Sequence, residues 1–242
     1  MSPSRCRCIA ARRQAAALHT QSPRHTKLPH IPRHLRAKNI RQARWPQIDL
    51  DVANAFYGAS GFVGSSPFER AARDFFRVTP FVALAAFAAL YALSRLGFAV
   101  RYAPTGRGLI FLVCTMAIGP GLVVNLGLKD HAHRPRPVQT QNFGGKFEFR
   151  PWYRFDGACP KNCSFVSGEA SEAFWMVAPA SLAPPPFRAL AISAALAFGL
   201  LASLLRMAFG GHYLSDVLLA GLLILMIVQA ARMLIFRDGE PR

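Results

Sequence analysis

Five long stretches of this 242-residue chain contain no charged side chain, and they limit the folds that are open to it. A helix that crosses a bilayer needs about 20 mostly apolar residues. A soluble helical domain of this size would struggle to bury all five stretches, so they predict an all-α, polytopic membrane bundle of five to six transmembrane helices. The stretches are Val78–Ser94, Gly108–Leu128, Ala173–Phe187, Ala189–Leu205 and Val217–Ala231.

The remaining chain divides around these stretches. Residues 1–46 carry eleven of the 29 Lys and Arg residues and no Asp or Glu, so much of the formal charge of +17 belongs to them. This composition is typical of a disordered basic tail without a specific nucleic-acid partner. We predict an interfacial or re-entrant segment at 47–77, the transmembrane domain at 78–236 and a short C-terminal tail at 237–242.

Polar residues gather in three clusters, each at the end of an apolar stretch. The first runs from Lys129 to Pro137, the second from Cys163 to Glu172 and the third from Leu205 to Asp216. The chain leaves one membrane face after the second cluster and returns to it before the third. All three clusters therefore lie on the same face. Ionisable groups are rare in membrane proteins and usually mark a site, so one composite site is predicted.

The side chains of these clusters suit an anion. Lys129, Arg136 and Arg206 supply positive charge, although each alone could equally contact lipid headgroups. Ser167 offers a hydroxyl and Gly168 a backbone N–H. These groups predict a site for a phosphate.

His212 and Asp216 add a chemical function to that site. Their i, i+4 spacing places them on the same face of a helix, if a helix contains both. Asp216 could then accept a hydrogen bond from one imidazole nitrogen and leave the other free as a nucleophile or base. Cations around an oriented His predict phosphoryl transfer.

The three motifs together resemble the type 2 phosphatidic acid phosphatase superfamily, which shares its helical fold with vanadium haloperoxidases. The stretches "RPRPVQ", "FGG" and "NCSFVSGEAS" further resemble the bacterial lipid A phosphatase branch. The motifs that carry the resemblance are Lys129-x6-Arg136-Pro137, Ser167-Gly168 and Arg206-x5-His212-x3-Asp216.

The resemblance implies a metal-independent phosphatase that needs no cofactor and acts through a phosphohistidine. It implies that His212 attacks the phosphorus atom and that Asp216 orients His212. The groups that it implies as phosphate ligands are Lys129, Arg136, Ser167, Gly168 and Arg206.

Glu169 departs from the family pattern. The family usually has Pro-Ser-Gly-His, with the His as general acid, whereas this chain has Val166-Ser167-Gly168-Glu169. Three interpretations remain open. Glu169 could be the acid or a proton shuttle, which requires a raised pKa although three nearby cations lower it. It could instead position part of the substrate, or the site could be impaired.

The site is predicted to face the periplasm from a bacterial inner membrane. Five arginines lie near the opposite face and favour this orientation under the positive-inside rule, although the basic tail argues for the reverse. On an oxidising face Cys159 and Cys163 are expected to form a disulfide rather than a zinc site, because they have no second pair of ligands. The arginines are Arg101, Arg107, Arg188, Arg232 and Arg237.

The resemblance also implies six helices, with one span before Leu50, and residues 1–49 contain no apolar stretch of that length. We therefore expect an apolar run of about 20 residues upstream of the present N-terminus.

Together these features predict an integral membrane phosphatase that acts on a phosphorylated lipid. The expected substrates, in order, are lipid A, phosphatidic acid or phosphatidylglycerophosphate, and polyprenyl pyrophosphate. The alternative is a catalytically impaired protein that binds anionic lipids. The apolar stretches argue against a haloperoxidase, and the His–Asp pair beside three cations argues against a transporter. The sequence does not predict the oligomeric state.

Overall fold

A computed structural model describes residues 46–64 and 66–237. The predicted basic tail and most of the C-terminal tail lie outside these residues. Four of the described helices are long and apolar enough to cross a membrane. They are α3 (Pro67–Arg95), α4 (Gly106–Met116) with its π-helical continuation η1 (Ala117–Leu128), α7 (Pro185–Ala208) and α8 (Leu214–Ile235).

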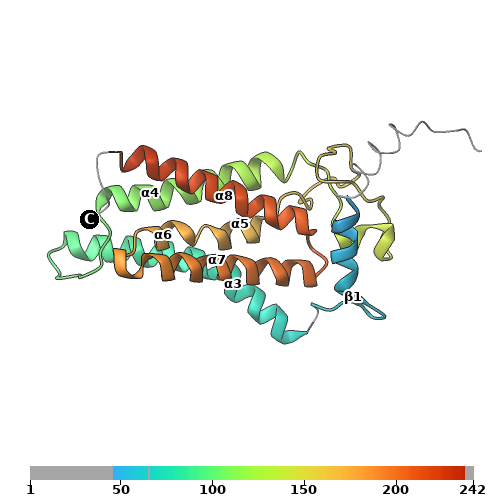
Figure 1. Cartoon of the computed structure of the whole chain (residues 1–242), viewed down its shortest axis with the longest axis horizontal. Helices are drawn as coiled ribbons and strands as arrows, with labels where there is room; N and C mark the ends of the chain where they lie inside the picture. The colour runs from blue at the N-terminus through green and yellow to red at the C-terminus, as the bar shows by residue number, and fades with distance from the viewer. Residues whose placement is uncertain (1–45, 65, 238–242) are drawn as a thin grey trace, which may run out of the picture. The chain divides into compact units, whose positions relative to one another are not determined.

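The third apolar stretch forms two short helices placed end to end. They are α5 (Gly168–Phe174) and α6 (Val177–Ser181). Helix α5 contacts α3, η1, α7 and α8, so it lies at the centre of the bundle (Figure 1). The expected five to six spans thus appear as four long helices around a broken central one. Even when they are joined across Trp175 and Met176, α5 and α6 run only from Gly168 to Ser181, which is shorter than the about 20 residues that a span needs.

Helix α3 begins earlier than its apolar stretch. Ser66 and Glu69 form a capping box, and Pro67 occupies the first turn, where its missing N–H is not needed. Residues 67–77, which the sequence placed in the interfacial segment, are therefore helical. Charged side chains in these first turns hid them from a search for apolar runs. Before them, residues 46–55 are helical and the strands β1 (Tyr57–Gly58) and β2 (Gly61–Phe62) form an antiparallel hairpin.

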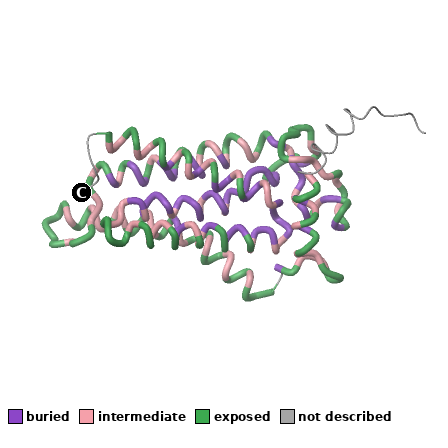
Figure 2. The backbone as a smooth tube through the Cα atoms, viewed as in Figure 1, coloured by how far each residue is buried: buried purple, intermediate pink, exposed green. Residues whose placement is uncertain are grey.

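Burial follows the arrangement expected of helices in lipid. Buried residues line α5, α6 and the inward faces of the long helices, whose outward faces are exposed (Figure 2). Many of the exposed residues are large and apolar. Such exposed apolar surface is costly in water and favourable in a bilayer. At the core, Trp175 donates a hydrogen bond to Thr115 Oγ1 over 2.9 Å.

The segment between η1 and α5 packs as an ordered loop. It contains the short 3₁₀-helices η2 (Pro137–Gln139) and η3 (Gln141–Phe143). A disulfide joins Cys159 and Cys163, whose Cα atoms lie 5.8 Å apart. The loop, the helix at 46–55 and the hairpin all lie at one end of the bundle (Figure 1).

Two glycines allow the long helices to close on α5. A Cβ atom on Gly199 of α7 would lie 2.4 Å from Phe174 Cδ1, and one on Gly221 of α8 would lie 2.8 Å from Phe174 Cε2. We predict that Gly199→Ala lowers the free energy of unfolding in detergent by about 1–3 kcal/mol, because the methyl group overpacks the Phe174 ring. Thermal unfolding measures the change.

Gly121→Ala is the control, since the nearest atom to its added methyl group is 3.6 Å away. The close packing at Phe174 would be refuted by a Gly199→Ala protein as stable as this control.

Candidate active site

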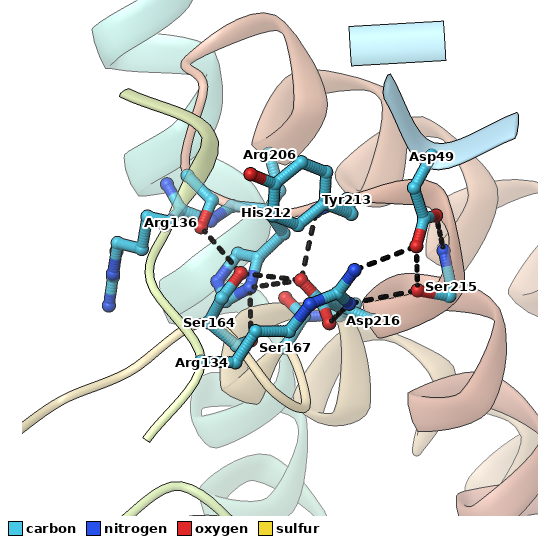
Figure 3. Close-up of polar contacts among 12 residues, drawn as sticks. Asp49, Arg134, Arg136, Ser164, Ser167, Arg206, His212, Tyr213, Ser215 and Asp216 are labelled. Carbon is cyan, nitrogen blue, oxygen red and sulfur yellow. Dashed lines mark hydrogen bonds and ion pairs between the residues drawn. The ribbon is translucent and has the colours of Figure 1, made fainter. Parts of the chain in front are cut away.

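The structure brings the three predicted clusters together at one end of the bundle. Lys129 follows η1, Ser167 caps the start of α5, Arg206 lies in the last turn of α7 and His212 precedes α8. Two helices end and two begin at this level, so residues far apart in the sequence become neighbours. Figure 3 shows Arg136, Ser167, Arg206 and His212 around one centre.

His212 is held as a neutral imidazole with one nitrogen available. It is 2% exposed, and its Nδ1 lies 2.7 Å from the carbonyl oxygen of Ser164. A carbonyl only accepts, so Nδ1 carries the proton and Nε2 keeps its lone pair. Burial lowers the pKa of His212 to about 4, against the opposing effect of Asp216. The ring is therefore uncharged near neutral pH, as a nucleophile requires.

The expected His212–Asp216 contact differs from the observed one. Helix α8 begins at Leu214, so His212 lies before it and the two residues are not on successive turns. His212 Nδ1 is 3.8 Å from Asp216 Oδ2, farther than from the Ser164 carbonyl. Asp216 instead accepts hydrogen bonds from Ser164 Oγ (2.5 Å) and from the Tyr213 backbone N–H (2.9 Å). It thus acts on His212 mainly through its charge and through Ser164.

Arg134 is the partner that the sequence did not identify. Its side chain is fully buried and lies between two carboxylates, Asp216 and Asp49, with 2.7 Å to Asp49 Oδ2 (Figure 3). It also stacks over the Tyr213 ring at 4.3 Å from the ring centroid. Buried charges require such pairing and hydrogen bonding. In the sequence, Arg134 was only one of several basic residues in its cluster.

Asp49 connects the helix at residues 46–55 to the site. Its carboxylate accepts hydrogen bonds from the Ser215 backbone N–H (2.8 Å) and the Ser215 hydroxyl (2.5 Å). The same hydroxyl accepts from Arg134 Nη1 over 2.9 Å. Part of the predicted interfacial segment is therefore part of the scaffold that holds Asp216.

The cations on the other side of His212 are largely available. Arg206 is 5% exposed, and its Nε has no hydrogen-bond partner among the described residues. Among the described residues, the Arg136 guanidinium donates to the carbonyl and amide oxygens of Asn162, which lies inside the disulfide-closed loop. Lys129 Nζ is 3.5 Å from Asn125 Oδ1. Clustered cations with unused donors form an anion site.

Ser167 and Gly168 place the backbone at the start of α5 close to this anion site. A Cβ atom on Gly168 would lie 3.1 Å from Lys129 Nζ, so glycine lets the lysine approach the start of α5. Ser167 is buried, and its Oγ accepts from the Ala170 N–H over 3.3 Å. Its hydroxyl hydrogen remains available as a donor.

Glu169 is paired with an arginine that the sequence did not identify. Arg73 of α3 donates to both of its carboxylate oxygens, from Nε over 2.9 Å and from Nη2 over 2.5 Å. Arg206 Nε lies 3.5 Å from Glu169 Oε2. Burial acts to raise the pKa of Glu169, but the Arg73 hydrogen bonds and the charge of Arg206 hold it below its usual range. Glu169 is therefore ionised near neutral pH, which opposes its interpretation as the general acid.

A metal centre finds no support in the part of the chain that the structure describes, because no group of three or more His, Cys, Asp or Glu side chains there could hold an ion. What the arrangement can do is bind a phosphate against Lys129, Arg136 and Arg206 and present a neutral imidazole to it.

Known proteins match the chain over this region and beyond. The PAP2 superfamily matches residues 108–239. A lipid A 4′-phosphatase of Francisella tularensis subsp. novicida is 34% identical over 81% of this chain and 90% of its own length. A lipid A 4′-phosphatase of Rhizobium leguminosarum is 43% identical over 48% of this chain and 50% of its own. No solved structure gave a significant match.

Removing the buried cation should damage the fold as well as the site. We predict that Arg134→Met lowers the free energy of unfolding by about 3–5 kcal/mol, because Asp49 and Asp216 are left buried without a counter-charge. Unfolding in detergent measures this change. The control is Arg154→Met, which breaks only the exposed pair with Asp156 and should not shift the transition. Equal transitions in the two variants would contradict the role of Arg134.

The alkaline limb of activity should report on Lys129. Burial lowers the pKa of Lys129 below 10.5, and the charge of Arg136 adds to the effect. Phosphate binding needs the protonated amine, so kcat/KM falls as pH rises through that lowered pKa. We predict that Lys129→Arg, whose charge persists, moves the fall to higher pH. Exposed Lys161→Arg is the control, and identical profiles for all three proteins would exclude Lys129 as the titrating group.

Proposed function

The chain belongs to the PAP2 superfamily, and we propose that it is a membrane phosphatase that removes the 4′-phosphate of lipid A through a phosphohistidine at His212. The observation that carries the proposal is the neutral, buried His212 beside cations with unused donors. The Francisella relative, which matches most of the chain, supports the choice of lipid.

In this proposal the phosphate group binds first. Lys129, Arg136 and Arg206 hold its oxygens, with the Ser167 hydroxyl and the Gly168 N–H as further donors. Arg206 Nε, which has the ion pair with Glu169 but no hydrogen-bond partner among the described residues, then gains a hydrogen-bond acceptor. The acyl chains of the lipid stay in the bilayer beside the apolar outer faces of the helices.

Two displacements at phosphorus follow. The lone pair of His212 Nε2 forms the N–P bond while the bond from phosphorus to the lipid oxygen breaks. That oxygen takes a proton from water, since Glu169 is ionised, and a hydroxide is left. This hydroxide attacks the phosphohistidine, and the N–P bond breaks to release inorganic phosphate and restore the neutral imidazole. The Ser164 carbonyl keeps Nδ1 protonated, and the nearby Asp216 carboxylate stabilises the positive charge that develops on the ring.

The proposal places the site on the periplasmic face. Arg101, Arg107, Arg188 and Arg232 are near the opposite ends of the long helices, and such residues favour the cytoplasmic side. A disulfide in the loop at the site end fits an oxidising compartment.

The test is phosphate release by the detergent-solubilised protein from lipid A, phosphatidic acid and polyprenyl pyrophosphate. We expect release from lipid A at the 4′ position and a loss of more than about 10³-fold in His212→Ala. A labelled substrate should leave an acid-labile phosphoryl group on the wild-type protein and none on the variant.

Faster release from one of the other two lipids would assign that substrate instead. Folded wild-type protein that releases no phosphate from any of them would favour a non-catalytic lipid-binding protein.

A further inference from the structure

We propose that Arg73 is a fourth cation of the phosphate site, and that it compensates the charge of Glu169 so that the site keeps its attraction for a phosphate. The inference rests on the proposed phosphatase function. It assigns a role to a residue outside the three motifs, on a helix that contributes none of them.

The contact is too specific for a chance surface ion pair. Arg73 presents Nε and Nη2 to the two oxygens of Glu169, the side-by-side geometry in which arginine binds carboxylates most strongly. The side chains are 34% and 19% exposed, so the pair is partly screened from water. Arg73 also lies over the Phe209 ring, 5.8 Å from its centroid, which fixes the guanidinium at the end of α7.

The position of Glu169 explains why compensation is needed. Its Oε2 is 3.5 Å from Arg206 Nε, a donor without a hydrogen-bond partner among the described residues. A phosphate that binds Arg206 must therefore approach a carboxylate. Like charges at such distances repel each other by an amount that grows as water is excluded.

The formal charges around the phosphate site show how much Glu169 weakens its attraction for an anion. Lys129, Arg136 and Arg206 give the site three positive charges, and an ionised Glu169 reduces the sum to two. Burial raises the pKa of the neighbouring Glu172 to about 7, so its carboxyl is not counted as a full negative charge. Arg73 restores the sum to three. A His at position 169 would bring no negative charge, whereas Glu169 does, and Arg73 is the cation that pairs with it.

The pair also gives Glu169 a role other than proton transfer. It links α3 to the start of α5 and to Arg206, so it is a positioning residue. When a phosphate binds, its oxygens compete with Glu169 for Arg206 and Arg73. Both arginines can then contact the phosphate and Glu169 together, so that no buried charge is left without a partner.

The test is a double-mutant cycle with Arg73→Gln, Glu169→Gln and the double variant, assayed with lipid A. We expect Arg73→Gln to raise KM by about 10-fold or more with a smaller change in kcat, because an uncompensated carboxylate weakens ground-state and transition-state binding alike. Glu169→Gln should lower KM. The double variant should return KM to within about 3-fold of the wild-type value, which requires coupling between the two residues.

The matched control is Arg70→Gln, which removes an exposed arginine one turn earlier in α3. It should leave both kinetic constants unchanged, and thermal unfolding should show that every variant is folded. Equal effects of Arg73→Gln with and without Glu169→Gln would overturn the proposal. So would a Glu169→Gln protein whose kcat falls by about 100-fold or more at unchanged KM, because that pattern identifies a proton donor.

Binding of inorganic phosphate separates this proposal from the proposed function. Calorimetry on the same four proteins should show weaker binding in Arg73→Gln and recovery in the double variant, whether or not any lipid is hydrolysed. If the double variant recovers phosphate binding but no protein hydrolyses lipid, only the phosphatase function is refuted. If lipid is hydrolysed but the double variant does not recover phosphate binding, only the role of Arg73 is refuted.

Discussion

The buried guanidinium of Arg134 is the interaction on which the site depends. It lies between Asp49 and Asp216, and no part of its side chain is exposed. Three charges away from water are tolerable only when each has a partner, so none of the three can move independently. The helix at 46–55, the loop after η1 and the start of α8 are thereby fixed relative to one another. Ser164, which also binds Asp216, then places its carbonyl against His212.

The apolar part of the bundle and its polar end have different tasks. Helices α3, α7, α8 and the α4–η1 helix enclose α5 through close contacts such as Phe174 against Gly199 and Gly221. That packing, together with the hydrogen bond from Trp175 to Thr115, positions the first residue of α5 beside Lys129. The charged groups can therefore lie at the membrane surface, where a lipid headgroup can reach them and water can pair those that the protein leaves unpaired.

The sequence predicted the parts of this arrangement that fixed spacing and apolar runs encode. Lys129, Arg136, Arg206 and His212 each lie a set number of residues from a motif partner at the end of an apolar run. Span counting was therefore enough to bring them to one face. The start of α3 was missed because its first turns are charged, although they are helical. The break in α5–α6 was missed because Trp175 and Met176 are as apolar as their neighbours.

Contacts between residues far apart in the sequence could not be predicted from the spacing of residues within a motif. Arg73 is 96 residues from Glu169, and Asp49 is 85 from Arg134. No local pattern distinguishes these residues from the charged residues around them. The i, i+4 spacing of His212 and Asp216 correctly made them neighbours, 3.8 Å apart, but it did not give the geometry between them. It assumed one helix, whereas the chain turns at Gly210 and Gly211 and enters α8 only at Leu214.

The distribution of charge around His212 gives these separate contacts a common physical meaning. On one side of the ring, Asp49 and Asp216 against Arg134 leave one net negative charge. On the other side, Lys129, Arg136 and Arg206, with Arg73 offsetting Glu169, leave three net positive charges. In the proposed reaction, phosphoryl transfer to Nε2 would bring negative oxygens to the positive side and make the imidazole more positive on the negative side. Both changes are stabilised by charges that are already in place, so little reorganisation is needed as the reaction proceeds. An uncompensated carboxylate at position 169 would weaken the positive side of this field beside Arg206. Arg73, which neutralises that carboxylate, therefore belongs to the same electrostatic unit as His212, the proposed nucleophile.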